Sequence, residues 1–279
     1  MLYIVGTPIG NLGDFSPRAI ETLRNVDFIA AEDTRVTVKL LNYFEIETPM
    51  ISYYEHNIRQ KGEYIIERML QGEDCAIVTD AGMPCISDPG EDLVRLCAEH
   101  DIPVAVVPGP SAVISALAAS ALPTGRFTFE GFLSVNRPQR LQHLEEIKEE
   151  TRTMIFYEAP HKLLATLEDF AEVLGADRKI TLCRELTKLH EEFFRTTMGE
   201  AVAHYTENKP KGEFVLVVEG FDKTAAEQAV KESYTVEDAV AMVKEKVAAG
   251  EKLTAACKEV AKATGFNRAE LYRMVSNEE

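Results

Sequence analysis

A twelve-residue loop, Thr79–Gly90, gathers the residue types that could do chemistry in this chain. It contains two glycines, two prolines and two aspartates, and it follows the apolar run Cys75–Val78. Glycine lets the backbone approach a ligand closely, and a carboxylate accepts hydrogen bonds or a proton. Asp80–Gly82 stands at the end of the predicted strand, so we expect a binding site there. Asp88 and Pro89 are also typical of a helix start, with Asp88 as the capping residue.

Further polar loops follow other predicted strands. Gly6–Gly13 is rich in glycine but has neither the P-loop pattern nor the dinucleotide fingerprint. Pro108–Ala112 brings a capping serine and free N–H groups to the start of a helix. Tyr157–His161, Arg184–Lys188 and Lys211–Glu213 lie at strand boundaries in the second half of the chain. These loops could converge on one cleft, although each alone is also typical of a solvated turn.

The elements that must position these loops alternate between strand and helix in the first half. The expected strands are Leu2–Val5, Asp27–Ala31, Met50–Tyr54, Ala76–Thr79 and Val104–Val107. The clearest helices between them are Arg18–Arg24, Arg59–Leu70 and Glu91–His100. This alternation predicts an α/β domain with a mostly parallel sheet, which we bound at residues 1–122.

A second αβ domain is expected at residues 123–221, and closer spacing of its strands predicts some antiparallel pairing. Its strands are Phe127–Phe132, Thr153–Tyr157, Ile180–Arg184, Glu192–Thr196 and Phe214–Glu219. Its helices are Arg140–Glu149 and His161–Leu174. Residues 222–279 lack strand signals and predict a small helical extension. There Thr235 and Asp238 resemble a capping box, and a helix-turn-helix pattern surrounds Gly265 with Val260, Phe266, Leu271 and Met274 as core positions.

Composition narrows the possible partners. The net charge of −16 argues against general affinity for nucleic acid, because phosphate binding rests on Lys and Arg. Five scattered cysteines and six scattered histidines favour neither a disulfide framework nor a metal site. We expect no membrane span and no export signal, and therefore a cytoplasmic protein.

Several motifs, taken in their order along the chain, resemble the tetrapyrrole methylase superfamily, the class III S-adenosylmethionine-dependent methyltransferases. They are Tyr3–Leu12, Ala30–Arg35, Asp80–Gly90, Pro108–Ala112, Phe129–Phe132, Tyr157–His161 and Arg184–Glu192. The match is most specific to the branch that modifies small-subunit ribosomal RNA. The resemblance implies two αβ domains with a cofactor cleft between them, a homodimer, and 2′-O-methylation of a cytidine in the decoding region of 16S rRNA.

By this resemblance, one set of residues would hold the S-adenosyl-L-methionine. They are Pro8, Asp80, Ala81, Gly82, Cys85, Ser111, Ala112, Tyr157, Glu158, Leu186 and Gly212. The loop departs from the family pattern Asp-Ala-Gly-Thr-Pro-Gly, since Met83 stands for Thr and Cys85 for Gly. If Cys85 has a positive φ, its side chain adds strain.

A ribose hydroxyl needs a base to remove its proton, and four residues are candidates: Glu32, Asp33, His56 and Lys188. Their ranking stays open at this point. Arg35, Lys188 and Arg268 are expected to contact the RNA, with the assembled 30S subunit as the expected partner because the chain is so acidic. Two other functions also stay open: C-methylation of a tetrapyrrole ring, and a catalytically silent nucleoside-binding module.

Overall fold

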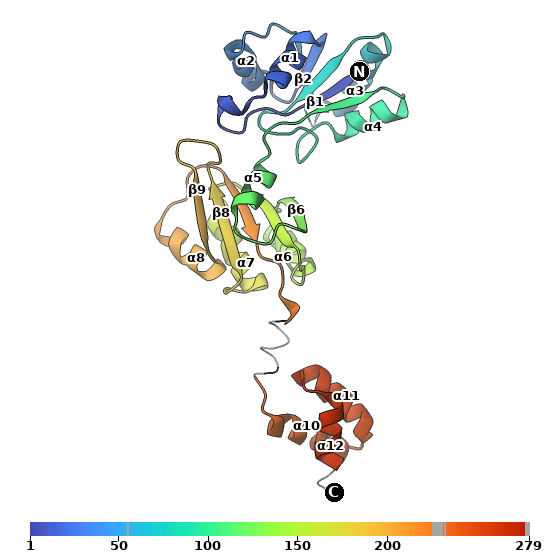
Figure 1. Cartoon of the computed structure of the whole chain (residues 1–279), viewed down its shortest axis with the longest axis vertical. Helices are drawn as coiled ribbons and strands as arrows, with labels where there is room; N and C mark the ends of the chain where they lie inside the picture. Colours follow the sequence, from blue (N-terminus) through green and yellow to red (C-terminus); the bar gives the residue numbers. More distant parts are fainter. Residues whose placement is uncertain (55, 225–230, 232, 277–279) are drawn as a thin grey trace. The chain divides into compact units, whose positions relative to one another are not determined.

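The computed structural model describes residues 1–54, 56–224, 231 and 233–276 (Figure 1). They form two compact units, residues 1–148 with 152–219 and residues 149–151 with 220–279. The first unit contains two five-stranded sheets, and the second contains helices. Among the described residues, no helix combines the length and the apolar character needed to cross a membrane.

The first sheet is parallel throughout, as the sequence predicts, with strand order β3-β2-β4-β1-β5. Its strands are β1 (Leu2–Val5), β2 (Phe28–Ala31), β3 (Met50–Ser52), β4 (Cys75–Val78) and β5 (Val104–Val107). Its helices are α1 (Pro17–Asn25), α2 (Thr34–Tyr43), α3 (Ile58–Leu70) and α4 (Glu91–Glu99), with a short 3₁₀ turn η1 (Leu12–Asp14).

Helices cover both faces of this sheet, which explains why its strands are apolar on both sides. In β4, Cys75 and Ile77 join one buried cluster with side chains of α3 and α4. Ala76 and Val78 join another with side chains of α1 and α2. Because all five strands run in the same direction, their carboxyl ends share one edge of the sheet, where the loops that follow them emerge.

The second sheet is mixed and has the order β6-β7-β10-β8-β9. Its strands are β6 (Phe127–Phe132), β7 (Thr153–Glu158), β8 (Lys179–Arg184), β9 (Glu192–Thr197) and β10 (Phe214–Val218). Only β6 and β7 pair in parallel, so the expected antiparallel pairing is confirmed. One face packs against α6 (Arg137–Glu146), α7 (Leu163–Leu174) and α8 (Met198–Glu207).

The other face of the second sheet packs against α5 (Ala112–Ala119), which directly follows the first sheet in the chain. Val113, Ala116 and Leu117 of α5 are buried together with Ile155 and Val217. This helix therefore ties the loop after β5 to the second sheet.

The C-terminal unit packs α10 (Val236–Ala248), α11 (Leu253–Thr264) and α12 (Arg268–Ser276) around one small core. The capping box is confirmed, since Thr235 and Asp238 exchange side-chain and backbone hydrogen bonds. Val260 and Leu271 are buried as expected, but the core assignment of Met274 is wrong: Met274 is exposed, and the neighbouring Val275 is buried instead. One residue along a helix turns the side chain by about 100°, which is enough to leave the apolar stripe.

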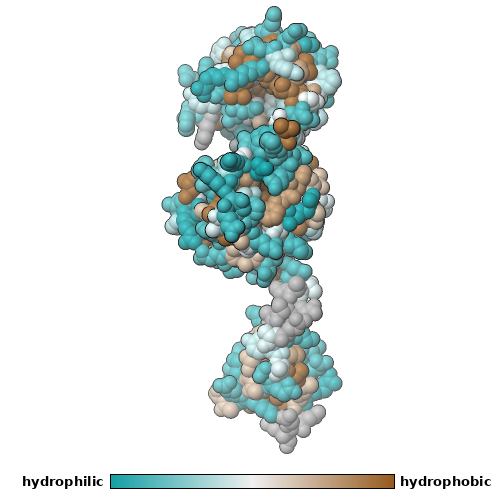
Figure 2. Space-filling model, turned by 90° about the vertical axis from the view of Figure 1, so that its left-hand side faces the viewer, coloured by the Kyte–Doolittle hydropathy of each residue, from teal (hydrophilic) through white to brown (hydrophobic). Residues whose placement is uncertain are grey.

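The surface is largely hydrophilic, as the composition predicts. Figure 2 shows hydrophilic residues over most of the visible face, with hydrophobic residues in separate patches. The most exposed large hydrophobic side chains are Leu189, Val135, Tyr43 and Phe132.

Candidate active site

Three loops of the first sheet meet at its carboxyl edge. The buried Thr7 pairs with Gly82 through two backbone hydrogen bonds, of 2.9 and 3.2 Å, and its hydroxyl donates to the carbonyl oxygen of Thr79 at 3.1 Å. A Cβ atom on Gly6 would lie 2.7 Å from the Cα atom of Gly109, so only glycine allows this approach. The loops after β1, β4 and β5 therefore form one continuous surface.

Loops of the second αβ half touch the same surface. A Cβ atom on Gly10 would lie 2.6 Å from the Cγ atom of Lys188 and 3.0 Å from the carbonyl oxygen of Leu186. A Cβ atom on Gly131 in β6 would lie 3.7 Å from the Oγ atom of Ser87. The structure thus brings the predicted loops of both halves into contact.

Lys188 is held by two carboxylates of the second half. Its Nζ atom donates to Glu185 at 3.0 Å and to Glu213 at 2.7 Å. Partial burial opposes its charge, but these hydrogen bonds outweigh burial, and the pKa of Lys188 is raised. Gly212, with φ +87°, is needed beside them because a Cβ atom would lie 2.7 Å from Glu185 Oε1. In this arrangement Lys188 stays protonated, so it has no lone pair with which to accept a proton.

The carboxylate of Glu158 is likewise engaged in hydrogen bonds within the protein. Its buried carboxylate accepts hydrogen bonds from the N–H of Ala159 at 2.8 Å and from the hydroxyl of Thr166 at 2.6 Å. The adjacent Tyr157 points elsewhere: burial and the negative charge of Asp88 raise the pKa of its hydroxyl to about 12. Glu158 therefore anchors the loop before α7, and Tyr157 faces the loop that carries Asp88.

Carboxylates of the first half crowd around one hydroxyl. The register pairs Ala31 of β2 with Val78 of β4, so the next residues, Glu32 and Thr79, lie side by side. The Thr79 hydroxyl donates to Glu32 and also lies within hydrogen-bonding reach of Asp88. One hydroxyl proton cannot serve both carboxylates at once. The two carboxylates therefore compete for this hydroxyl, and Glu32 also accepts a hydrogen bond from the backbone N–H of Asp80 at 3.4 Å.

The crowding of these carboxylates shifts their pKa values. Burial, together with the charges of Glu32 and Asp80, raises the pKa of Asp88 to about 6. Burial and the charge of Glu32 also raise the pKa of Asp80. Like charges in one partly desolvated place disfavour full ionisation. Groups with such shifted pKa values gather at functional sites more often than elsewhere.

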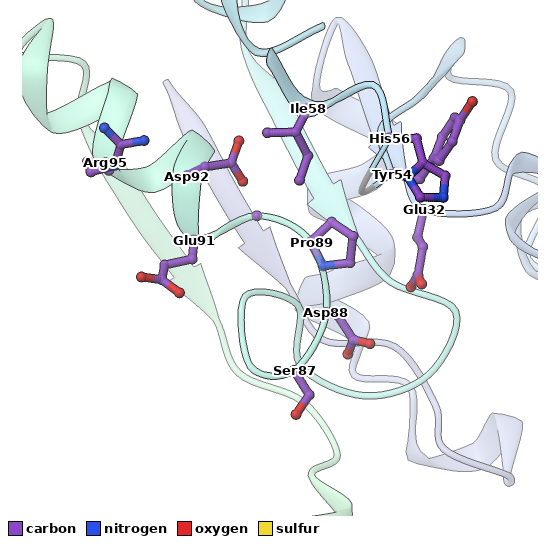
Figure 3. Close-up of a pocket in the computed structure, with 11 residues that line it drawn as sticks. Glu32, Tyr54, His56, Ile58, Ser87, Asp88, Pro89, Glu91, Asp92 and Arg95 are labelled. Carbon is purple, nitrogen blue, oxygen red and sulfur yellow. The ribbon is translucent and has the colours of Figure 1, made fainter. Parts of the chain in front are cut away.

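Glu32 and Asp88 border a pocket of about 680 Å³ at the edge of the first sheet (Figure 3). It is lined by Glu32, Tyr54, His56, Ile58, Ser87, Asp88, Pro89, Gly90, Glu91, Asp92 and Arg95. In Figure 3, Glu32 extends toward the loop after β4, while Asp88 extends from that loop toward Glu32. Tyr54 and His56 lie on one side, and Asp92 and Arg95 of α4 on the other.

Asp88 is free for this position because it does not begin α4, contrary to the prediction. Gly90 occupies the N-cap position with φ +134° and without a side-chain cap. The preceding Cys85 and Ser87 have φ values of +71° and +64°. The left-handed backbone turns the loop once more before the helix and directs Asp88 into the pocket instead. Cys85 thus has the positive φ on which the expected strain depends.

The remaining predicted site residues lie in different surroundings. Asp33 caps α2, and the guanidinium of Arg35 at 2.6 Å contributes to lowering its pKa to about 2. His56 lines the pocket beside Tyr54, with 6.2 Å between their ring centroids. Ser111 caps α5, as expected. Arg268 is exposed at the start of α12, in the C-terminal unit.

Asp88 and Thr187 are among the side chains that were not singled out as site residues from the sequence. The Asp-Pro context of Asp88 indicated a cap. The buried hydroxyl of Thr187 has no hydrogen-bond partner among the described residues and lies against Gly10. The positive φ of Thr187, +64°, is invisible in the sequence.

Comparison with known proteins gives a consistent result. Residues 1–202 match the model of the Tetrapyrrole (Corrin/Porphyrin) Methylases. The chain is 47% identical, over 98% of its length and 96% of the relative's, to Ribosomal RNA small subunit methyltransferase I of Synechocystis sp.. The protein of that name from Thermotoga maritima is 48% identical, with 98% of its length matched by 78% of this chain. The crystal structure of diphthine synthase superposes with a TM-score of 0.61 over 78% of this chain and 89% of that chain, at 13% identity, which is a likeness of fold.

Proposed function

Since the chain belongs to the tetrapyrrole methylase family, we propose that it methylates a ribose 2′-hydroxyl of small-subunit ribosomal RNA. The family's class uses S-adenosylmethionine, so the chain is an S-adenosylmethionine-dependent methyltransferase. The observation that carries the RNA assignment is the 47% identity across nearly the whole length of a relative named for that substrate. The pocket beside the predicted cofactor residues supports it, because an acceptor group needs a place next to the methyl donor.

We assign the cofactor to the surface where the loops of the two αβ halves touch, with residues 1–122 and 123–221 as the two domains. The residues proposed to hold it are Pro8, Asp80, Ala81, Gly82, Cys85, Ser111, Ala112, Tyr157, Glu158, Leu186 and Gly212. The surface fits such a molecule: the Thr187 hydroxyl, which has no hydrogen-bond partner in the part of the chain that the structure describes, offers a polar contact, and Asp80 offers an exposed carboxylate to a cation. Leu186, which is buried, and Glu158 would act by shaping the loops.

When bound, the cofactor supplies an electrophilic methyl group on a sulfonium. The chain's own residues must then hold the acceptor oxygen in line with that group, and such positioning can lower the barrier by roughly 7–11 kcal/mol. Exclusion of water by the loops around Thr7 and Gly82 would protect the donor. A base at the acceptor oxygen completes the requirements.

The finer assignments follow the same reasoning. We propose a cytidine in the decoding region of 16S rRNA as the target, a homodimer as the active form, and the cytoplasm as its location. With a net charge of −16, the protein is better suited to recognise an assembled 30S subunit by shape than to hold free RNA by charge. Arg35, Lys188 and Arg268 are the proposed phosphate contacts, although Lys188 must first leave Glu185 and Glu213.

The test is methyl transfer from radiolabelled S-adenosylmethionine to unmodified 30S subunits, with extracted 16S rRNA and a tetrapyrrole precursor as parallel substrates. Digestion of the RNA to nucleosides should recover the label in one 2′-O-methylated nucleoside, with faster labelling of the assembled subunit. Label in the tetrapyrrole alone would reassign the substrate. Cofactor binding without label in any substrate would favour a silent binding module.

A further inference from the structure

Resting on the proposed function, we propose that the pocket between the Thr79–Gly90 loop and α4 receives the acceptor nucleoside, and that Asp88 accepts the proton of its 2′-hydroxyl. This pocket is built from the first αβ half alone. It includes Asp88, Tyr54 and Arg95, none of which the sequence assigned to the site.

The pocket has the size and the lining that a nucleoside needs. Its volume of about 680 Å³ lies within the range of roughly 300–1,000 Å³ that is usual for small-ligand sites. Tyr54 is exposed beside it and offers an aromatic face for a base that has left its stack. Arg95 forms an exposed i,i+4 ion pair with Glu99 at 3.2 Å, its one ion pair among the described residues, so it can turn to a phosphate of the RNA at little cost.

Asp88 lies where pocket and cofactor surface meet. It borders the pocket, and its charge acts on the hydroxyl of Tyr157, one of the residues proposed to hold the cofactor. Asp88 also lies within hydrogen-bonding reach of Thr79, and Thr79 directly precedes Asp80 at the start of the same loop. A carboxylate at this position can reach an acceptor held in the pocket and facing the methyl donor.

The other candidate bases are worse placed. Asp33 is ion-paired with Arg35 and serves as the cap of α2. Lys188 is bound by two carboxylates and remains protonated. Glu32 holds the Thr79 hydroxyl, so it supports Asp88 by competing for that donor. His56 lies on the pocket wall and is the rival that the experiment must separate.

The proton and electron balance is complete without a further reactant. As the 2′-oxygen forms its bond to the methyl carbon, the carbon–sulfur bond breaks and its electron pair stays on sulfur, which becomes a neutral thioether. The hydroxyl proton passes to the Asp88 carboxylate, which later releases it to solvent. A carboxyl with a pKa near 6 is mostly ionised at neutral pH and yet is more basic than an ordinary aspartate.

The experiment compares Asp88→Asn with the wild type in single-turnover methylation of 30S subunits from pH 5 to 8.5. The wild-type rate should rise about tenfold per pH unit below pH 6 and level off above it. The titratable groups around Asp88 are Glu32, Tyr54, His56, Asp80, Cys85, Glu91, Asp92, Arg95 and Tyr157. The same profile is therefore recorded for His56→Gln, because His56 is the rival base. Asp88→Asn should lower the plateau rate by roughly 10²–10³, with the dissociation constant of S-adenosylmethionine changed less than threefold. His56→Gln should keep the rise near pH 6.

Two further variants make the result interpretable. Asp88→Glu retains a carboxylate and should recover at least a tenth of the wild-type rate. Asp101→Asn is the control, because it removes a carboxylate at the opposite edge of the first sheet. Asp101 has a φ of +54°, which Asn tolerates, so this variant should keep the wild-type rate. If Asp88→Asn retained more than a third of the wild-type rate, or lost affinity for S-adenosylmethionine by the same factor as it lost rate, the role of Asp88 as the base would be overturned. The proposed function would stand in that case. Absence of label with the wild type would instead overturn the proposed function and, with it, this assignment.

Discussion

Asp80 and Asp88 of the first αβ half and Glu185 of the second stand in opposite environments, although both halves contribute loops to one surface. In the first half, burial and the charge of Glu32 raise the pKa values of Asp80 and Asp88. In the second half, Glu185 accepts hydrogen bonds from the backbone N–H of Glu213 and from the ammonium group of Lys188, and its pKa is lowered. The first half therefore has groups poised to take up a proton, whereas the second half has charges that are used to hold loops in place.

The largest effect should come from breaking a charge pair of the second half. Asp169 is buried and accepts hydrogen bonds from Arg137 at 2.8 Å and from the buried Arg140 at 2.6 Å. Asp169→Ala should lower the free energy of unfolding by about 3–5 kcal/mol, because it leaves Arg140 buried without its carboxylate. Urea unfolding measures this loss.

A control is available on the same helix. Glu172 pairs with the same Arg137 at 2.7 Å but is exposed, so Glu172→Ala should cost less than about 0.5 kcal/mol. Equal effects of Asp169→Ala and Glu172→Ala would mean that burial does not distinguish these ion pairs. The interpretation that buried charges of the second half hold its structure in place would then be wrong.

The next effect concerns the junction between the halves. Gly10→Ala would place a Cβ atom 2.6 Å from Lys188 Cγ and 3.0 Å from the carbonyl oxygen of Leu186, so the 185–188 loop must shift. We expect the affinity for S-adenosylmethionine, measured by titration calorimetry, to fall about tenfold, which is about 1.4 kcal/mol. Gly125→Ala meets no atom within 4 Å and should leave the affinity unchanged. A normal affinity in Gly10→Ala would separate this junction from the cofactor site.

Much of the fold could be predicted from the sequence, because apolar runs bounded by glycine, proline and aspartate mark strands that are buried on both faces. Among the helices that the structure describes, two were not predicted. Thr34–Tyr43 is rich in β-branched residues, which favour strands locally, yet it forms α2 because Thr37 and Leu41 pack on the sheet. The second, α8, begins directly after β9, with Thr197 as its cap, so no loop separates the two patterns.

The site was less predictable, because its charges meet through strand register. Glu32 and Thr79 are far apart in the sequence, and only the pairing of β2 with β4 brings them together. Left-handed backbone at Cys85 and Ser87 then moves Asp88 from the expected helix cap into the pocket. The loop motifs predicted where a site would lie, but the roles that we propose within it depend on contacts that no local pattern contains.

A smaller effect should be seen in stability at the pocket. Between the ordinary pKa of 3.8 and the folded-state pKa of about 6, the native protein binds more protons at Asp88 than the unfolded chain does. The contribution of Asp88 to stability therefore falls as the pH rises through this range. Removing the charge with Asp88→Asn should raise the free energy of unfolding at pH 7 by about 1 kcal/mol, after allowance for solvent screening. The gain should vanish near pH 4, and a destabilised variant at pH 7 would contradict the strained-carboxylate interpretation.

The smallest net effect should come from Cys85→Gly, since two contributions oppose each other. Relief of the left-handed backbone at φ +71° favours the variant by about 1–2 kcal/mol. Loss of the partly buried thiol and the added freedom of glycine in the unfolded chain disfavour it by a similar amount. We expect the free energy of unfolding, measured by thermal denaturation, to lie within about 1 kcal/mol of the wild-type value, with Gly125→Ala as the reference for a harmless change. A clearly more stable variant would mean that this loop stores strain as well as charge, which would strengthen the contrast with the second half.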